Sequence, residues 1–231
     1  MGLTLYVAKK MINYQSEKSP AFKLRKKRAE RIKSIIKESY DKYSEVNIID
    51  IGGTKTYWNI IPTEFLIEHK VHISVVNLPS DNPFPENDNI FSFYEDDGCN
   101  LVKFPDNSFH IAHSNSVIEH VGNDSNREKF AREIKRVARV YYLQTPNYWF
   151  PIEPHFVTPV FHWLPRKIRI KLVCCFALGW YKRAKTYNEA EKFVDNCRLL
   201  TKKELKVLFP EAIIFKERIL FFIKSFMLIK K

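Results

Sequence analysis

Long apolar runs and secretion signals are both missing from this 231-residue chain. Its longest apolar stretch, LVCCFALGWY at 172–181, is shorter than the roughly 18 residues that a membrane-spanning helix needs. The N-terminus, MGLTLYVAKK, lacks the apolar segment and the cleavage site of a secretory signal. Tyr6 stands where a myristoylation signal has Ser or Thr. The sequence therefore predicts a cytoplasmic protein, with peripheral attachment to a membrane as an open alternative.

Paired cysteines are also missing. The chain has 4 cysteines, none of them in a CxxC pair and none with a histidine at ligand spacing along the sequence: Cys99, Cys174, Cys175 and Cys197. This pattern is typical of a reduced protein without structural zinc, so the sequence predicts no metal ligands.

Two nucleotide-binding motifs are absent as well. No GxGxxG follows a predicted strand, which argues against a nicotinamide-binding fold, and no GxxxxGK[ST] is present to cradle a triphosphate.

Charge is abundant but unevenly distributed, with a formal net charge of +12. Residues 1–45 hold 12 Lys and Arg against 5 Asp and Glu, residues 46–146 hold 9 against 14, and residues 147–231 hold 17 against 7. Basic flanks suit an anionic partner such as a membrane surface, a phosphorylated substrate or a nucleic acid. A solvated surface without a partner is the alternative.

Hydrophobic periodicity predicts an α/β fold. Residues 21–43 have the spacing of an amphipathic helix, which either packs on the domain or lies on a membrane. Apolar runs at 45–54, 71–80, 90–99, 109–114 and 140–147 predict strands that alternate with helical stretches, as in a doubly wound parallel sheet. Two further strand-like runs end the chain. We expect a basic helical arm over 1–44 and one domain over 45–231.

Residues 147–200 break this regularity. They are rich in proline and aromatic residues, and we expect an insertion that forms a lid or wall within the domain. The aromatic side chains form either an apolar wall of the active site or the core of a small subdomain. Capping boxes are predicted at Ser125 with Glu128 and at Thr201 with Glu204.

Polar residues and glycines follow four successive predicted strands. Because ligands of open α/β sheets bind beyond the carboxyl ends of the strands, these positions outline a site. They are Asp50, Gly52, Gly53 and Thr54, then Asn77, then Asp96, Asp97 and Gly98, then Ser114, Asn115, Ser116, Glu119 and His120.

Four segments, IIDIGGT, VVNL, DDGCNLVKFPDNSFHIAHSNSVIEHV and VYYLQTPN, resemble the class I S-adenosylmethionine-dependent methyltransferases of the type-11 group. The resemblance covers about residues 45–147. It implies a Rossmann-like seven-stranded sheet with the last strand antiparallel and S-adenosylmethionine as the cofactor. The helical and aromatic insertion then precedes the last two strands.

The resemblance also implies which residues bind the cofactor. The methionine end would be lined by Asp50, Gly52 and Gly53, the ribose by Asn77, the adenine by Asp97 and Gly98, and the sulfonium by Ser114 and Asn115. Two positions depart from the family pattern, because Thr54 replaces a glycine and Asn77 replaces an acid. The loss of a charge-assisted hydrogen bond at Asn77 predicts weaker cofactor binding.

Three residues are candidates for catalysis. If the acceptor is a hydroxyl, a base must take its proton, and His120 follows the fourth strand directly. Glu153 and His155 lie in PIEPHF, which resembles a stretch of methyltransferases associated with bacterial cell-surface sugars. For each histidine the alternative is a packing or capping role.

The sequence favours an enzyme that methylates an oxygen of a small or glycan-like acceptor, as in polysaccharide biosynthesis. One alternative is an RNA methyltransferase that uses its basic flanks, although no NPPY-like tetrapeptide follows the fourth strand. The other is a non-catalytic module that binds a membrane or a partner through its basic helix. The sequence makes no prediction of the oligomeric state.

Overall fold

The computed structural model describes residues 19–80 and 84–231. Seven strands form one mixed sheet in the order β3-β2-β1-β4-β5-β9-β8. They are β1 (Val46–Ile51), β2 (Val71–Asn77), β3 (Phe91–Glu95), β4 (Phe109–Asn115), β5 (Ala138–Pro146), β8 (Ile213–Ile219) and β9 (Phe222–Lys230). The first five are parallel, whereas β9 pairs antiparallel with both β5 and β8. This confirms the predicted Rossmann-like sheet and its antiparallel last strand.

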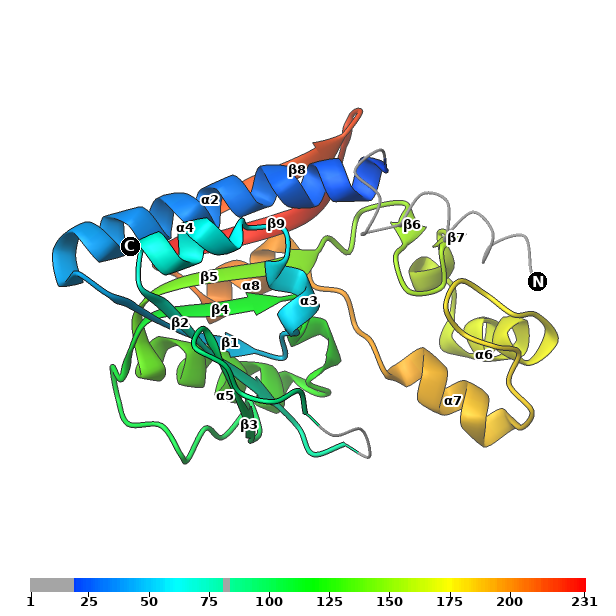
Figure 1. Ribbon diagram of the computed structural model, residues 1–231. Coiled ribbons are helices and arrows are strands. Elements are labelled where there is room, and N and C mark those ends of the chain that lie inside the picture. The colour runs from blue at the N-terminus through cyan, green and yellow to red at the C-terminus, as the bar shows by residue number, and fades with distance from the viewer. Residues whose placement is uncertain (1–18, 81–83) are drawn as a thin grey trace.

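Helices cover both faces of the sheet (Figure 1). One face is covered by α2 (Pro20–Tyr43) and α4 (Thr63–Glu68), with the short α3 (Lys55–Trp58) at the end of β1. The other face is covered by α5 (Asp124–Val137) and α8 (Lys202–Leu208). Each face has its own core of buried aliphatic and aromatic side chains. Among the described residues, no helix combines the length and the apolar character that crossing a membrane requires.

Helix α2 is part of the core. Ile32 and Ile36 are fully buried against the sheet, so the amphipathic helix packs on the domain along this face. Its polar side is also engaged: the guanidinium of Arg28 lies 3.2 Å from the carboxylate of Glu217 on β8, and both side chains are buried. Ser225 donates a further hydrogen bond to the same carboxylate.

The two predicted capping boxes had different outcomes. Thr201 and Glu204 form the reciprocal box at the start of α8, as predicted. The box predicted at Ser125 and Glu128 is wrong, because α5 begins earlier, at Asp124. Its N-cap is Asn123, whose backbone is extended and whose side-chain oxygen accepts the amide of Asn126. A short amide side chain competes well for this role, which leaves Ser125 inside the first turn.

The insertion is a small helical unit beside the carboxyl ends of the strands (Figure 1). It contains the two-residue strands β6 (Ile152–Glu153) and β7 (Thr158–Pro159), the 3-10 turn η2 (Phe161–Trp163), and the helices α6 (Arg166–Cys175) and α7 (Tyr187–Asp195). Its aromatic residues differ in burial. Phe156 and Phe161 form a separate core with α6 and α7, whereas Trp149 and Trp163 are exposed.

We expect Arg28→Met to lower the free energy of unfolding by about 3 kcal/mol, because it leaves the buried carboxylate of Glu217 without its guanidinium partner. Chemical denaturation of the full chain measures this change. The control is Lys26→Met on the exposed face of the same helix, expected to change the stability by no more than about 0.5 kcal/mol. Equal effects of the two substitutions would show that the ion pair does not hold α2 on the sheet.

Candidate active site

The turn after β1 is folded tightly over the carboxylate of Asp50. That carboxylate is fully buried: the indole of Trp58 donates to one oxygen at 2.8 Å, and Nδ1 of His113 lies 2.6 Å from the other. A Cβ at Gly53 would lie 1.8 Å from the first of these oxygens, and Gly52 has a φ of +72°. Both positions therefore require glycine, and the turn presents bare backbone at the end of β1.

Two residues predicted to line the cofactor lie beneath this turn instead. Both oxygens of Asp50 are used by Trp58 and His113, and Ser114 is buried and donates to the carbonyl of Ile51 at 3.0 Å. The expected direct contact of Asp50 and Ser114 with a ligand is therefore corrected. These side chains fix the backbone of the site, because buried polar groups satisfy their hydrogen bonds within the protein.

Asn77, at the end of β2, connects to the same turn. Its side-chain amide donates to the carbonyl of Gly53 at 2.9 Å, a hydrogen bond that an acid could not supply. This donor gives a physical reason for asparagine at a position where the family usually has an acid. The oxygen of the amide remains as an acceptor for a hydroxyl.

The loop after β3 completes this edge. Asp97 is exposed, and one of its carboxylate oxygens accepts the amide of Cys99 at 2.8 Å. Gly98 packs closely on β1, since a Cβ there would lie 2.7 Å from the side chain of Ile51. At the end of β4, the side-chain oxygen of Asn115 is buried without a protein hydrogen-bond partner.

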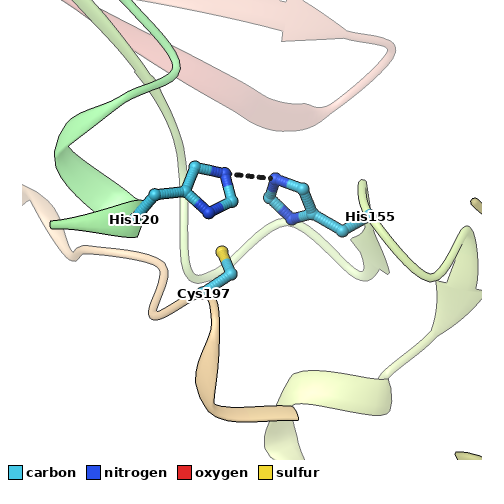
Figure 2. A group of neighbouring side chains, drawn as sticks. All are labelled: His120, His155 and Cys197. Carbon is cyan, nitrogen blue, oxygen red and sulfur yellow. Dashed lines mark hydrogen bonds between the residues drawn. The ribbon is translucent and has the colours of Figure 1, made fainter. Parts of the chain in front are cut away.

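Contacts between side chains connect the segment after β4 to the insertion, and Figure 2 shows the one between His120 and His155. His120 ends the short 3-10 helix η1 (Ile118–His120) after β4, and His155 lies between β6 and β7. Their Nε2 atoms are 3.1 Å apart. Nδ1 of His120 donates to the carbonyl of Asn196 at 2.9 Å, and Nδ1 of His155 lies 2.7 Å from the carboxylate of Glu153. The structure thus brings together all three residues predicted to be catalytic.

Burial and neighbouring charge shift the pKa values of the two histidines in opposite directions. Burial lowers the pKa of both histidines. At His155, however, the hydrogen bond and negative charge of Glu153 outweigh burial and raise the pKa overall, whereas the pKa of His120 stays lowered. Burial raises the pKa of Glu119 to about 7. Glu119 accepts the hydroxyl of Thr145 at 2.9 Å, and its other oxygen is buried without a partner.

A polar cavity of about 460 Å³ lies between the start of α5 and the insertion. Glu153 is in its wall together with three arginines, Arg127, Arg169 and Arg198. Arg127 is almost fully buried, and its Nε and one Nη have no protein partner. Buried guanidinium nitrogens without partners suit an anionic ligand, because an unpaired buried donor is costly.

Sequence reasoning missed two parts of this site. Cys197 lies beside the two histidines (Figure 2), although the sequence gives it no motif. Arg127 belongs to a helix whose charged residues look uniformly solvent-facing in the sequence. Both positions depend on how the insertion folds back onto α5, and no local pattern reports that contact.

A family model described as a methyltransferase domain matches residues 67–140, which include β2 to β4, α5 and the start of β5. The strand order of the sheet and the glycine turn after β1 agree with that family. This match supports assignment of the chain to the class I methyltransferases of the type-11 group. S-adenosylmethionine is the methyl donor that this family implies.

Solved structures similar to this methyltransferase include three from different organisms. A SAM-dependent methyltransferase from Methanosarcina mazei is 15% identical, with a TM-score of 0.46 over 80% of this chain and 91% of that one. An O-methyltransferase family protein from Burkholderia thailandensis is 12% identical, with a TM-score of 0.48 over 87% and 55%. Phosphoethanolamine N-methyltransferase 2 from Haemonchus contortus is 12% identical, with a TM-score of 0.45 over 74% and 35%. No curated protein matches the sequence.

The observed geometry fits the cofactor of this methyltransferase. Gly52 and Gly53 leave main-chain groups uncovered by side chains at the end of β1, since a Cβ there would collide with Val117 or Asp50, and Asn115 supplies a buried oxygen that lacks a partner. The residues that would hold S-adenosylmethionine are Gly52, Gly53, Asn77, Asp97, Gly98 and Asn115. Asp50 and Ser114 would hold the backbone around it.

We expect Gly53→Ala to weaken S-adenosylmethionine binding at least tenfold, about 1.4 kcal/mol, because the new Cβ would displace either the turn or the carboxylate of Asp50. Isothermal titration calorimetry measures the affinity. Lys203→Ala is the control, since Lys203 is an exposed residue of α8. Unchanged affinity in a folded Gly53→Ala variant would remove this turn from the cofactor site.

Proposed function

We propose that this methyltransferase transfers the methyl group to a hydroxyl oxygen of a small or glycan-like acceptor. The observation that carries the proposal is the His120–His155 pair, which lies after β4 and next to the polar cavity. A hydroxyl is a weak nucleophile until its proton is drawn away, and an enzyme needs a positioned group for that purpose. Glu153 orients His155 through the hydrogen bond to Nδ1 and through the short loop that carries both residues.

Besides removal of the proton, alignment of the methyl donor with the acceptor hydroxyl contributes to the rate enhancement. S-adenosylmethionine provides a methyl group on a positively charged sulfur, which an oxygen attacks in line as the sulfur leaves. The glycine turn and Asn77 fix the donor side, while η1 and the insertion fix the acceptor side. Because the Asn196 carbonyl and Glu153 each hold one imidazole, the two rings have little freedom to turn. Held reactants of this kind gain rate from orientation alone.

The cavity supports an acceptor that carries an anionic group. The unpartnered nitrogens of Arg127 and Arg169 are donors for a phosphate or a carboxylate. A volume of about 460 Å³ suits one or two sugar rings. Phosphorylated or acidic sugars of cell-surface polysaccharides have this chemistry, and the PIEPHF segment that resembles enzymes of that class forms part of the wall.

We expect His120→Ala and His155→Ala each to lower kcat for methyl transfer at least about 100-fold, because each removes a nitrogen from the acceptor side. The affinity for S-adenosylmethionine should stay within about twofold in calorimetry. Activity is measured as transfer of label from the cofactor to acidic and phosphorylated oligosaccharides in a cell extract, with the product identified by mass spectrometry.

His72→Ala is the matched control, since His72 lies at the amino end of β2 and bonds only Ser92 among the described contacts. Full turnover by both His120→Ala and His155→Ala would contradict the proposed role of the pair. Labelling of nitrogen in the product would contradict the assignment to oxygen.

A further inference from the structure

The hydrogen bonds of the histidine pair fix where the protons lie. A backbone carbonyl only accepts, so Nδ1 of His120 carries a proton toward Asn196. The Glu153 carboxylate already accepts the amides of His155 and Phe156, which marks it as an acceptor for Nδ1 of His155 as well. In two neutral rings, both Nε2 atoms therefore bear lone pairs, and they face each other across 3.1 Å.

Two facing lone pairs repel each other unless a positive charge lies between or beside them. One shared proton would serve the two nitrogens, but it would not involve the third donor atom of the cluster. The sulfur of Cys197 lies with both imidazoles, and the three ligand atoms are all within 4.8 Å of one another (Figure 2). A metal ion satisfies all three at once.

We propose that Nε2 of His120, Nε2 of His155 and Sγ of Cys197 bind a divalent transition-metal cation of the zinc class. Two nitrogens at about 2.1 Å from a tetrahedral zinc ion lie roughly 3.4 Å apart, close to the separation observed here. A donor set of two imidazoles and one thiolate suits zinc rather than magnesium or calcium.

The surroundings of the three donors match those of a metal centre. Ligating histidines commonly donate their second ring nitrogen to a carboxylate or a backbone carbonyl, and Glu153 and Asn196 supply one of each. The donors come from η1, the insertion and the segment after α7. A bound cation therefore joins the insertion to the sheet.

Three protein ligands leave one tetrahedral position open, as in catalytic rather than structural zinc sites. This catalytic part rests on the proposed function. The acceptor hydroxyl would take the open position, where the cation lowers its pKa; the two histidines then act as ligands in place of a base, and the proton passes to solvent. The oxygen then forms a bond to the methyl carbon as the carbon–sulfur bond breaks, and S-adenosylhomocysteine leaves as a neutral thioether.

Cobalt(II) is the probe for this site. The full chain, freed of metal with a chelator, is titrated with Co²⁺ and then with Zn²⁺. We expect one Co²⁺ per chain, a thiolate-to-cobalt charge-transfer band, the intense visible bands of tetrahedral cobalt, and displacement by Zn²⁺. Cys197→Ser should abolish the charge-transfer band, and His155→Ala should weaken binding at least about 100-fold. Glu153→Gln should weaken it about 10- to 100-fold, because Glu153 only orients a ligand.

Cys175→Ser is the matched control, since Cys175 is an exposed cysteine of α6, and it should leave the spectrum unchanged. Cobalt binding without a thiolate band, or equal binding by Cys197→Ser, would overturn the proposal. The cobalt spectrum is independent of turnover, so a metal-loaded protein that methylates no hydroxyl would contradict the proposed function and the catalytic part that rests on it, but would leave the metal site in place. Full methyl transfer by metal-free protein would overturn the catalytic part of the inference.

The tip of the hairpin between β8 and β9 is apolar and exposed. Four consecutive apolar residues there are exposed: Ile219 by 36%, Leu220 by 84%, Phe221 by 90% and Phe222 by 51%. Scattered apolar residues are common on protein surfaces, but a continuous apolar tip of this kind marks an interaction site.

Positive charge surrounds this tip. Lys216 and Arg218 are exposed on β8, and Lys23, Lys26 and Lys27 are exposed on the first half of α2. Helix α2 lies along β8 through the Arg28–Glu217 pair, and the hairpin tip projects near the N-terminal end of α2 (Figure 1). An apolar tip bordered by cations is complementary to a bilayer with anionic headgroups. We infer that this hairpin docks the protein on an anionic lipid surface.

Sedimentation of the full chain with phosphatidylserine–phosphatidylcholine vesicles tests this inference. Leu220→Ser with Phe221→Ser should weaken binding at least tenfold, whereas Val207→Ser, at a 74% exposed position on α8, should have no effect. Binding should fall with added salt and on pure phosphatidylcholine. Equal binding by the hairpin double variant, or none by the unaltered chain, would overturn it.

Discussion

The buried carboxylate of Asp50 is the constraint on which the cofactor side of this methyltransferase depends. It holds Trp58 with one oxygen and His113 with the other, so it joins the turn after β1 to β4 beneath the surface of the site. The chain above it must pass so closely that Gly53 has no room for a Cβ. Because Trp58 and His113 fix the carboxylate, the backbone of the turn that packs against it is also fixed. Asn77 holds the same turn through a hydrogen bond to the carbonyl of Gly53. A rigid turn of this kind lets main-chain groups approach a ligand without a cost of ordering.

The proposed acceptor side depends on a second series of contacts, from Asn196 through His120 and His155 to Glu153. This series crosses between the sheet and an insertion that has its own small core. The insertion therefore completes the site, since it supplies His155, Glu153 and Cys197, while β4 supplies only His120 through η1. Nearby, the backbone amide of Arg198 donates to the carbonyl of Glu119, which holds the returning segment against η1.

Much of the fold could be predicted from sequence, because short apolar runs bounded by Gly and Pro mark parallel strands and the resemblance supplied their arrangement. Local signals failed where two residues compete for one role, as when Asn123 rather than Ser125 caps α5. The candidate site, like the fold, could be predicted only in part. Residues at strand ends were found, but burial of Asp50 and Ser114 beneath the rim, the donor role of Asn77, and the approach of Cys197 to the histidines depend on tertiary contacts between distant segments. No spacing along the chain encodes those contacts.

The central claim is that the turn fixed by Asp50 is built to hold S-adenosylmethionine. Calorimetric titration of the full chain with this cofactor tests the claim most directly, with S-adenosylhomocysteine as the competing ligand. The account predicts saturable heat from one site per chain, and loss of that heat when the site is already filled by S-adenosylhomocysteine. An absence of binding at millimolar cofactor by folded protein would contradict it.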